Sequence, residues 1–201
     1  MARPQAADYA ERRAAIVEQA AELYARKGFA SASVADLADR VGTSKALIYH
    51  YYPSKEEILF EVMDSHLRAL SGATEETLAL DAGPEDKLRA LAHAFMRLYV
   101  GAAARHKVLL NELDALPPAR RAEIVERQRR LIDAVEALIL AIQPALADRP
   151  HLTRPSAMLF FGMINWTHTW LDPQGRADPQ QIATLAAEIY LDGIGRGDIP
   201  G

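Results

Sequence analysis

Two short helices joined by a glycine turn, near residues 33–57, restrict this chain more than any other sequence feature. Ser33 followed by Asp36 forms a capping box, the side-chain pairing that starts a helix. The helix that it opens covers 34–40 and has room for only two turns. Val41-Gly42 ends it, because glycine adopts the left-handed conformation of a helix end at little cost.

A second short helix is predicted from Ser44 to about Tyr51, where Pro53 stops it. Ser54-Lys-Glu-Glu57 is a second capping box, which starts a long helix. Two such helices around a tight turn predict a helix-turn-helix, which presents its second helix to the major groove of DNA. The residues left exposed there suit phosphates and base edges: Thr43, Ser44, Lys45, Ala46, Tyr49, His50 and Tyr51.

Helical spacing of Ala, Leu, Glu and Arg continues along the chain, without the alternating runs typical of strands. We therefore predict an all-α protein of nine helices. Thr153 is expected to cap the eighth helix, and Asp178-Pro179 to cap and open the last. The predicted ranges are 8–27, 34–40, 44–51, 55 onward, 84–104, 106–116, 119–147, 153–171 and 179–195.

Composition excludes several classes of protein. Half of the 201 residues are hydrophobic and a quarter are charged, as in ordinary globular chains. The absence of cysteine excludes a disulfide framework, a Cys-ligated metal and a thiol nucleophile. No signal peptide and no membrane-spanning apolar run is recognisable, so we expect a cytoplasmic protein without membrane contact. The net charge of −4 does not by itself indicate nucleic acid as a partner.

A family resemblance becomes specific over residues 12–63. The stretch from Gly42 to Leu59 resembles the signature of the TetR/AcrR transcriptional regulators, and the segments 20–29 and 33–38 are similar to the same family. Ala46 departs from the pattern, in which glycine is frequent, and so does Leu47, which stands where threonine is frequent. The resemblance implies a three-helix DNA-binding domain over residues 1–54 and a helical ligand-binding and dimerisation domain over 55–201.

The resemblance also assigns contacts with double-stranded operator DNA. It implies that Tyr49 and Lys55 contact phosphates, and that Ser33 offers a phosphate site at the amino terminus of its helix. Ser44, Lys45 and Ala46 would face base edges, with His50 and Tyr51 on the flank of the groove. His50 could equally be only solvent-exposed, and Tyr52 is expected to pack into the core.

The family forms homodimers through its last two helices. One face of the penultimate helix and one of the last would supply this surface here, at Leu159, Met163, Trp166, Trp170, Leu185 and Ile189. The alternative is that these residues are core within one subunit, and both can hold.

A ligand pocket is expected among helices four to eight. Its candidate residues are Phe95, Tyr99, His106, Asn111, Phe160, Phe161, Asn165 and His168. Each apolar member could instead be ordinary core. The polar members are the better indication, because a buried amide or imidazole needs a partner.

The effector class follows from a second resemblance. Residues 158–175 are similar to a branch of the family with an Asn-Trp…Trp pattern, whose members respond to acyl-CoA thioesters. This implies a catabolic repressor that an acyl-CoA or aryl-acetyl-CoA releases from a palindromic operator. Cations available for CoA phosphates are Arg105, Lys107, Arg120, Arg121, Arg127, Arg129 and Arg130. The alternative is an efflux-type repressor that senses a hydrophobic drug.

An enzyme is the alternative of another class. A helical bundle can hold a di-metal carboxylate site, but the chain lacks the required Glu-x-x-His spacing. It also lacks a Gly-x-Ser-x-Gly nucleophile elbow and a phosphate-binding glycine loop. We therefore expect no catalysis, no metal site and no cofactor.

Overall fold

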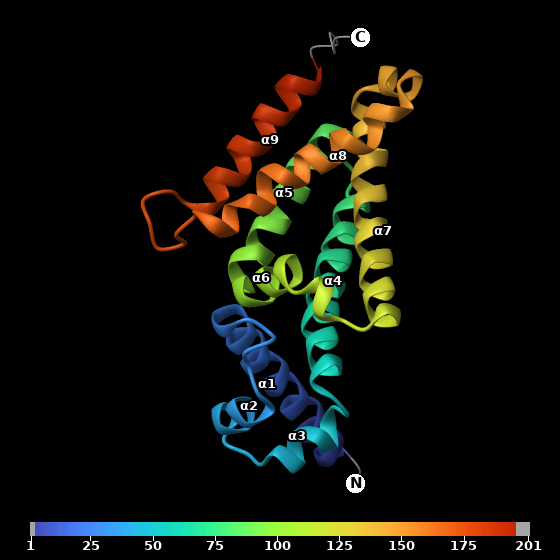
Figure 1. The fold of residues 1–201 in the computed structure, drawn as a ribbon. Coiled ribbons are helices and arrows are strands. Elements are labelled where there is room, and N and C mark those ends of the chain that lie inside the picture. The colour runs from blue at the N-terminus through green and yellow to red at the C-terminus, as the bar shows by residue number, and fades with distance from the viewer. Residues whose placement is uncertain (1–2, 196–201) are drawn as a thin grey trace. The chain divides into compact units, whose positions relative to one another are not determined.

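The computed structural model describes residues 3–195, and over this range its regular elements are all helices, without a strand (Figure 1). The predicted all-α fold with nine helices is confirmed for this range. None of the described helices is long and apolar enough to cross a membrane. The helices are α1 (Arg3–Lys27), α2 (Val34–Val41), α3 (Lys45–Tyr51), α4 (Lys55–Leu78), α5 (Pro84–Gly101), α6 (Ala103–Asn111), α7 (Pro118–Ile142), α8 (Pro150–Asn165) and α9 (Pro179–Gly195). Three short 3₁₀ helices complete the chain: η1 (Leu113–Ala115), η2 (Pro144–Asp148) and η3 (Trp166–Thr169).

The chain divides into two compact units. The first unit contains the residues up to Leu67 together with Ala104–Val125, and the second contains Arg68–Ala103 and the residues from Glu126 onward. Helix α4 therefore contributes its first part to one unit and its last part to the other. The boundary predicted at residue 54 separates DNA binding from ligand binding, whereas these two units are defined by compactness. The functional boundary therefore stays a prediction.

The predicted ends of α2 are confirmed. The Asp36 N–H donates to Ser33 Oγ at 3.1 Å, and the Ser33 N–H donates to Asp36 Oδ2 at 2.9 Å, which completes the capping box. Gly42 adopts the left-handed conformation, with φ of 71°, and its N–H bonds to carbonyls of the last turn of α2. This conformation disfavours a residue with a Cβ, so glycine turns the chain here at the lowest cost.

Helix α3 is held by its ends and by one buried side chain. Ser44 is its N-cap, with Oγ accepting the Leu47 N–H at 3.2 Å. Ile48 is fully buried, whereas the rest of the helix is exposed or half-buried. The second predicted helix start also holds, because Ser54 Oγ accepts the Glu57 N–H at 3.2 Å before α4.

An apolar core supports α2 and α3 within the first unit. Helix α1 contacts α2, and α2 contacts α3. Tyr24 of α1 packs edge-on against Phe29, with ring centroids 5.3 Å apart, and both rings are buried. The other large buried side chains include Ile16, Leu23, Leu37, Ile58, Leu59 and Met63.

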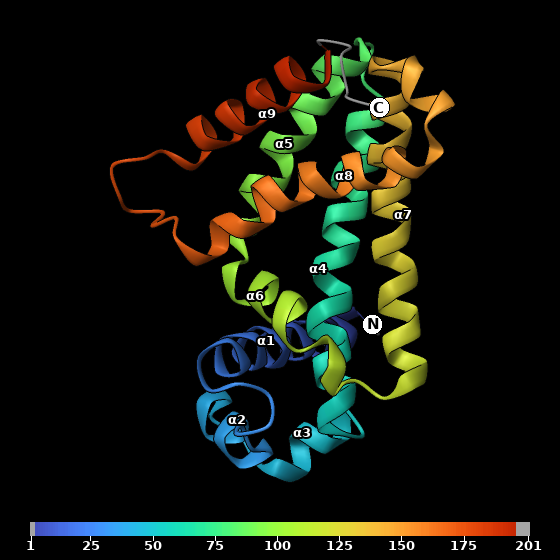
Figure 2. The ribbon, with the colours of Figure 1, turned by 45° about the horizontal axis from the view of Figure 1, so that its top comes forward.

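In the second unit, α5, α8 and α9 pack together (Figure 2). The ring of Phe95 on α5 stacks on Tyr99 and on Phe161, with centroids 6.0 Å and 5.9 Å apart. Arg89 of α5 donates to Glu188 of α9 at 2.8 Å. The core of this unit is therefore aromatic, with an ion pair at its margin.

Several predicted helix ends are wrong. The helix expected over 84–104 stops at Gly101, and α6 begins at Ala103 rather than His106. Ala102 between them leaves the helical conformation, with φ of −133°. The helix expected to reach residue 116 ends at Asn111, and η1 follows as a separate turn. A run of glycine and alanine gives no side-chain signal for such a break, so the sequence pattern missed it.

Helix α1 begins at Arg3 rather than at residue 8, and the helix expected to reach residue 171 ends at Asn165, where η3 follows. Prolines account for two further differences. Helix α7, expected to reach residue 147, ends at Ile142, and Pro144 begins η2, because proline has no N–H to continue a helix. Thr153 does not cap α8: it lies inside the helix and donates to the Leu146 carbonyl at 3.4 Å. Pro150 is the first residue of that helix, a position that proline favours. The predicted cap at Asp178 is confirmed, since its Oδ1 accepts the Gln180 N–H at 3.2 Å.

A buried histidine pair lies inside the first unit. Nε2 of His66 on α4 is 3.2 Å from Nδ1 of His106 on α6, and both side chains are buried. One ring must donate and the other accept, so at least one of them is neutral. Burial, together with the positive charge of Arg105, lowers the pKa of His66 to about 4.

We expect His66 to make folding acid-sensitive by about 2 kcal/mol between pH 7 and pH 5. In the unfolded chain this residue has its ordinary pKa of 6.5 and takes up a proton over this range, whereas the folded form stays neutral down to about pH 4. Stability is therefore lost as the pH falls. Urea unfolding at both pH values measures the loss, and His66→Gln should reduce it. The same pH dependence in that variant would contradict the explanation.

Candidate nucleic-acid interface and ligand groove

The face of α3 opposite Ile48 is open to solvent. Ser44, Lys45, Ala46, Tyr49 and His50 are all exposed, and the Tyr49 ring keeps half of its surface accessible. A hydroxyl, a cation, a small residue and a phenol thus lie on one short helix. This combination matches what a major groove offers, namely phosphate oxygens at its edges and base edges at its floor.

Two predicted residues lie at the margins of this face. Thr43 and Tyr51 are half-buried. The Tyr51 ring lies 4.8 Å from that of Tyr9 on α1, and 5.4 Å from the imidazole of His50. Tyr51 therefore flanks the exposed face and packs partly against α1.

Tyr52 belongs to the core, as the sequence predicted. Its side chain is buried, and Arg13 of α1 donates from Nε to its hydroxyl at 3.3 Å. The guanidinium also lies over the ring, 4.8 Å from its centroid. Burial raises the pKa of the Tyr52 hydroxyl. The residue after α3 is thus fixed to α1.

Ser33 is exposed, but its polar groups are already used. Its N–H and its hydroxyl both donate to Asp36 Oδ2 at 2.9 Å. These bonds, with Lys27 nearby, lower the pKa of Asp36 to about 2. A carboxylate therefore occupies the amino terminus of α2, where the resemblance implied a DNA phosphate. The phosphate role of Ser33 requires this pair to open.

Lys55 points into the first unit. Its Nζ donates to the Phe29 carbonyl and lies 4.0 Å from the centroid of the Phe29 ring. The side chain is half-buried. In this conformation Lys55 does not extend outward to a phosphate, which differs from the contact that the resemblance implied.

The predicted pocket aromatics are packed core and do not line an open site. Phe95 and Phe160 are fully buried, and Tyr99 and Phe161 nearly so. Phe160 meets Tyr190 of α9 edge-on at 5.5 Å, and Phe95 stacks on its two neighbours. Burial raises the pKa of the Tyr99 hydroxyl. Their helical spacing indicated an apolar face, which serves here to join α5, α8 and α9.

The predicted polar anchors do not converge on one place either. His106 lies in the first unit beside His66. Asn111 is exposed, and its amide donates to the Lys107 carbonyl of the preceding turn at 2.8 Å. His168 Nδ1 lies 2.7 Å from the Asn165 carbonyl, and Asn165 keeps a buried Oδ1 without a hydrogen bond.

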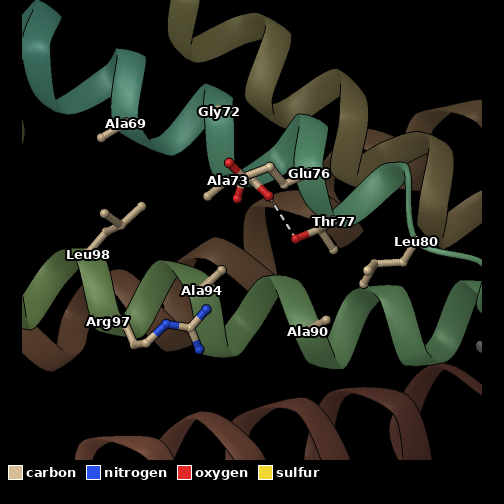
Figure 3. Close-up of a pocket in the computed structure, with 10 residues that line it drawn as sticks. All are labelled: Ala69, Gly72, Ala73, Glu76, Thr77, Leu80, Ala90, Ala94, Arg97 and Leu98. Carbon is tan, nitrogen blue, oxygen red and sulfur yellow. Dashed lines mark hydrogen bonds between the residues drawn. The ribbon is translucent and has the colours of Figure 1, made fainter.

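A groove of about 620 Å³ lies elsewhere in the second unit, between α4 and α5 (Figure 3). Its walls are mostly small side chains, with Glu76 on the α4 wall and Arg97 on the α5 wall. Neither charged side chain has a hydrogen bond or ion pair with another described residue. None of the eight predicted ligand residues lines it. The lining residues are Ala69, Gly72, Ala73, Glu76, Thr77, Leu80, Ala90, Ala94, Arg97 and Leu98.

The cations expected near CoA phosphates are mostly paired with carboxylates. Arg120 donates two bonds to Glu57, at 2.8 Å and 2.7 Å, and Arg105 binds Glu18 at 2.5 Å. Arg121 binds Asp114, and Arg129 and Arg130 both bind Glu126. The predicted basic surface is thus largely neutralised within the chain, whereas Arg97, which the sequence reasoning missed, is not.

Large apolar side chains are exposed on α8, η3 and α9. The accessible fractions are 67% for Leu159, 65% for Trp166, 54% for Trp170, 55% for Leu185 and 56% for Ile189. Met163 is half-buried among them. Exposed apolar side chains that lie together are typical of an interaction site. Of the six residues predicted for dimerisation, five are exposed and Met163 is half-buried, and Leu159, Met163 and Ile189 line one apolar groove.

Comparison with known proteins agrees with this geometry. The model of bacterial regulatory proteins of the tetR family matches residues 16–62, and that of the tetracyclin repressor-like C-terminal domain matches residues 81–194. The chain belongs to the TetR family. It is therefore a ligand-responsive transcriptional regulator with a helix-turn-helix, and not an enzyme.

Individual relatives of this TetR-family regulator cover nearly its whole length. The transcriptional repressor KstR2 of Mycolicibacterium smegmatis is 27% identical over 192 residues, or 92% of this chain and 91% of the relative. A TetR-family regulator from Bordetella parapertussis has a TM-score of 0.86 at 33% identity, covering 94% of this chain and 97% of the other. AibR, solved in complex with isovaleryl coenzyme A and operator DNA, has a TM-score of 0.77 at 26% identity, covering 89% and 97%.

Replacing Lys45 or Tyr49 by alanine should weaken operator binding about tenfold each, the scale of one hydrogen bond to a charged group. Both side chains are exposed, so thermal unfolding should stay unchanged. Fluorescence anisotropy with a duplex that the wild-type protein has selected from a random-sequence pool measures the affinity. Lys107→Ala, an exposed cation on α6, is the matched control. Equal affinities of all four proteins would contradict the assignment of this face.

Proposed function

We propose that a dimer of this chain represses transcription by binding a palindromic operator, and that an acyl-CoA or aryl-acetyl-CoA thioester releases it. The observation that carries operator binding is the exposed face of α3, built from Ser44, Lys45 and Tyr49 on a capped and anchored helix. The observation that supports the effector is an unpaired cation in a groove of the second unit.

Dimerisation would use the exposed apolar residues of α8 and α9. Within this surface lies a groove of about 410 Å³, lined by apolar residues that include Leu159, Met163 and Ile189. A second copy of the chain can fill it, because a two-fold interface brings the same patch of each subunit together. Two α3 helices held about 34 Å apart would then meet successive major grooves on one side of the DNA.

Replacing Ile189 by Gln should raise the dimer dissociation constant at least about tenfold, because the two-fold axis removes the same buried contact twice. Leu78→Gln is the matched control, since Leu78 is also exposed but lies outside this surface. Sedimentation equilibrium measures the dimer dissociation constant of both variants and of the wild-type protein. A dimer unaffected by Ile189→Gln would exclude the surface, and a monomeric wild-type protein would exclude the dimer.

The effector would bind between α4 and α5. A volume of about 620 Å³ lies within the roughly 300–1,000 Å³ of small-molecule sites. The alanine and glycine walls suit an acyl chain, and Arg97 supplies a charged donor for a thioester carbonyl or a phosphate. The similarity to AibR, whose structure was solved in complex with isovaleryl coenzyme A, supports an acyl-CoA rather than another anion as the effector.

Helix α4 offers a route from this groove to the DNA-binding residues. The groove residues Ala69 to Thr77 lie on the same continuous helix whose first residue follows the helix-turn-helix. A ligand that binds one position of α4 more tightly than another shifts the population of the two. Release follows if the favoured position changes the spacing of the two α3 helices.

A hydrophobic cation is the second candidate effector, because Glu76 on the opposite wall would favour it. The two classes make opposite demands on the groove. Arg97 attracts an anionic thioester and repels a cation, whereas Glu76 does the reverse.

We therefore expect Arg97→Gln to raise the concentration of phenylacetyl-CoA or isovaleryl-CoA needed for operator release by about tenfold, the scale of one hydrogen bond to a charged group. Glu76→Gln, the matched control, should leave that concentration unchanged or lower it. Free acids should be weaker than their thioesters. Release by cationic drugs alone, lost in Glu76→Gln and kept in Arg97→Gln, would identify an efflux-type regulator instead.

A further inference from the structure

Phe29 is held from two sides by residues far from it in the chain. It lies in the turn between α1 and α2, directly after Gly28, and its ring is buried. Its N–H donates to Glu112 Oε1 at 3.2 Å, and its carbonyl accepts from Lys55 Nζ. Both backbone groups of this one residue are therefore bonded to charged side chains, a stronger attachment than neutral groups provide.

We propose that Lys55 and Glu112 are positioning residues for operator binding: they hold Phe29 and so set how α2 and α3 are presented to DNA. The proposal rests on the proposed operator binding. It reassigns Lys55, which by resemblance to the family would contact a DNA phosphate. It also adds Glu112, which lies outside the helix-turn-helix.

The geometry around Lys55 favours this role. The ammonium group bonds to the Phe29 carbonyl and lies 4.0 Å from the centroid of the Phe29 ring, so Lys55 makes two contacts with the same residue. Reaching a phosphate would break both contacts and leave the carbonyl with only the N–H of Ala32, at 3.3 Å, as its donor. An exposed cation such as Lys45 has no such cost.

Glu112 is placed to hold the other side of the turn. It lies between α6 and η1, where its own N–H bonds to the Val108 carbonyl at 3.0 Å. Its carboxylate oxygen lies 3.6 Å from the point where a Cβ on Gly28 would be. Gly28 has a φ of 78°, so the left-handed turn that ends α1 directs the next N–H at this carboxylate.

Two ion pairs reinforce the same attachment within the first unit. Arg105 of α6 binds Glu18 of α1 at 2.5 Å, and Arg120 of α7 binds Glu57 of α4 through two bonds. The segment 104–125 is thereby joined to α1 and to the start of α4. This explains why it belongs to the same compact unit as the helix-turn-helix, although the segment Arg68–Ala103 separates it from Leu67.

The salt dependence of operator binding distinguishes positioning from phosphate contact. Each phosphate contact contributes about 0.9 to the slope of log K against log salt concentration, so loss of one contact per subunit lowers the slope by about 1.8 per dimer. We expect Lys55→Met to weaken binding about tenfold with an unchanged slope. Lys107→Met, which removes an exposed cation outside the DNA-binding face, should change neither quantity.

Glu112 gives the complementary test. Glu112→Ala should weaken binding about tenfold with an unchanged slope, whereas Glu112→Gln, which keeps an oxygen to accept the Phe29 N–H, should bind within about twofold of wild type. Glu22→Ala, an exposed carboxylate on α1, is the matched control. Wild-type affinity in Glu112→Ala would overturn the role of Glu112.

The outcomes separate this inference from the proposed function. No salt-sensitive binding by the wild-type protein would refute operator binding itself. If the wild-type protein binds the operator and the slope of Lys55→Met is lower by about 1.8, operator binding stands but Lys55 contacts a phosphate, and the positioning role is refuted. If Lys55→Met does not fold, Lys55→Gln serves, because it removes the charge and keeps a polar donor on the side of the Phe29 carbonyl. Its slope must then equal that of wild type.

Discussion

A helix of seven residues cannot maintain itself in water, and α3 has seven. Everything that makes it usable for binding DNA must come from outside: the Ser44 cap at its start, the buried Ile48 in its middle, and Tyr52 fixed to Arg13 after its end. Because these attachments use only one face and the two termini, the opposite face stays free for DNA. The first unit is thus organised around presenting a short helix that has little stability of its own.

The sequence predicted this region well because its signals are local. The Ser33–Asp36 box and the left-handed Gly42 each act over three or four residues, so residue types at fixed spacing identify them. The contacts of Phe29 with Lys55 and Glu112 span 26 and 83 positions, and no local pattern reveals them. The family resemblance named Lys55 as a phosphate contact, and the direction of its side chain became evident only from the fold.

In the second unit the sequence predicted the exposed surface better than the interior. Trp166 and Leu185 were assigned to a dimer surface, and both are exposed as that role requires. Phe95 and Phe160 were expected to line a pocket, yet aromatic rings of this size fill the space between α5, α8 and α9. The groove that does exist depends on missing side-chain volume, at Gly72, Ala73 and Ala94. The sequence signal for this groove was the small residues at helical spacing on α4 and α5, together with Arg97.

In the proposed mechanism, a ligand in the second unit controls the spacing of the two α3 helices of a dimer. Because the chain has no cysteine, Asp39→Cys on the exposed end of α2 places one spin label on each subunit. The distance between the two labels, measured by pulsed dipolar spectroscopy, should be well defined with operator DNA and should shift by several ångströms when isovaleryl-CoA or phenylacetyl-CoA releases it. No dipolar signal, or a distance that stays unchanged while the ligand releases the DNA, would contradict this account.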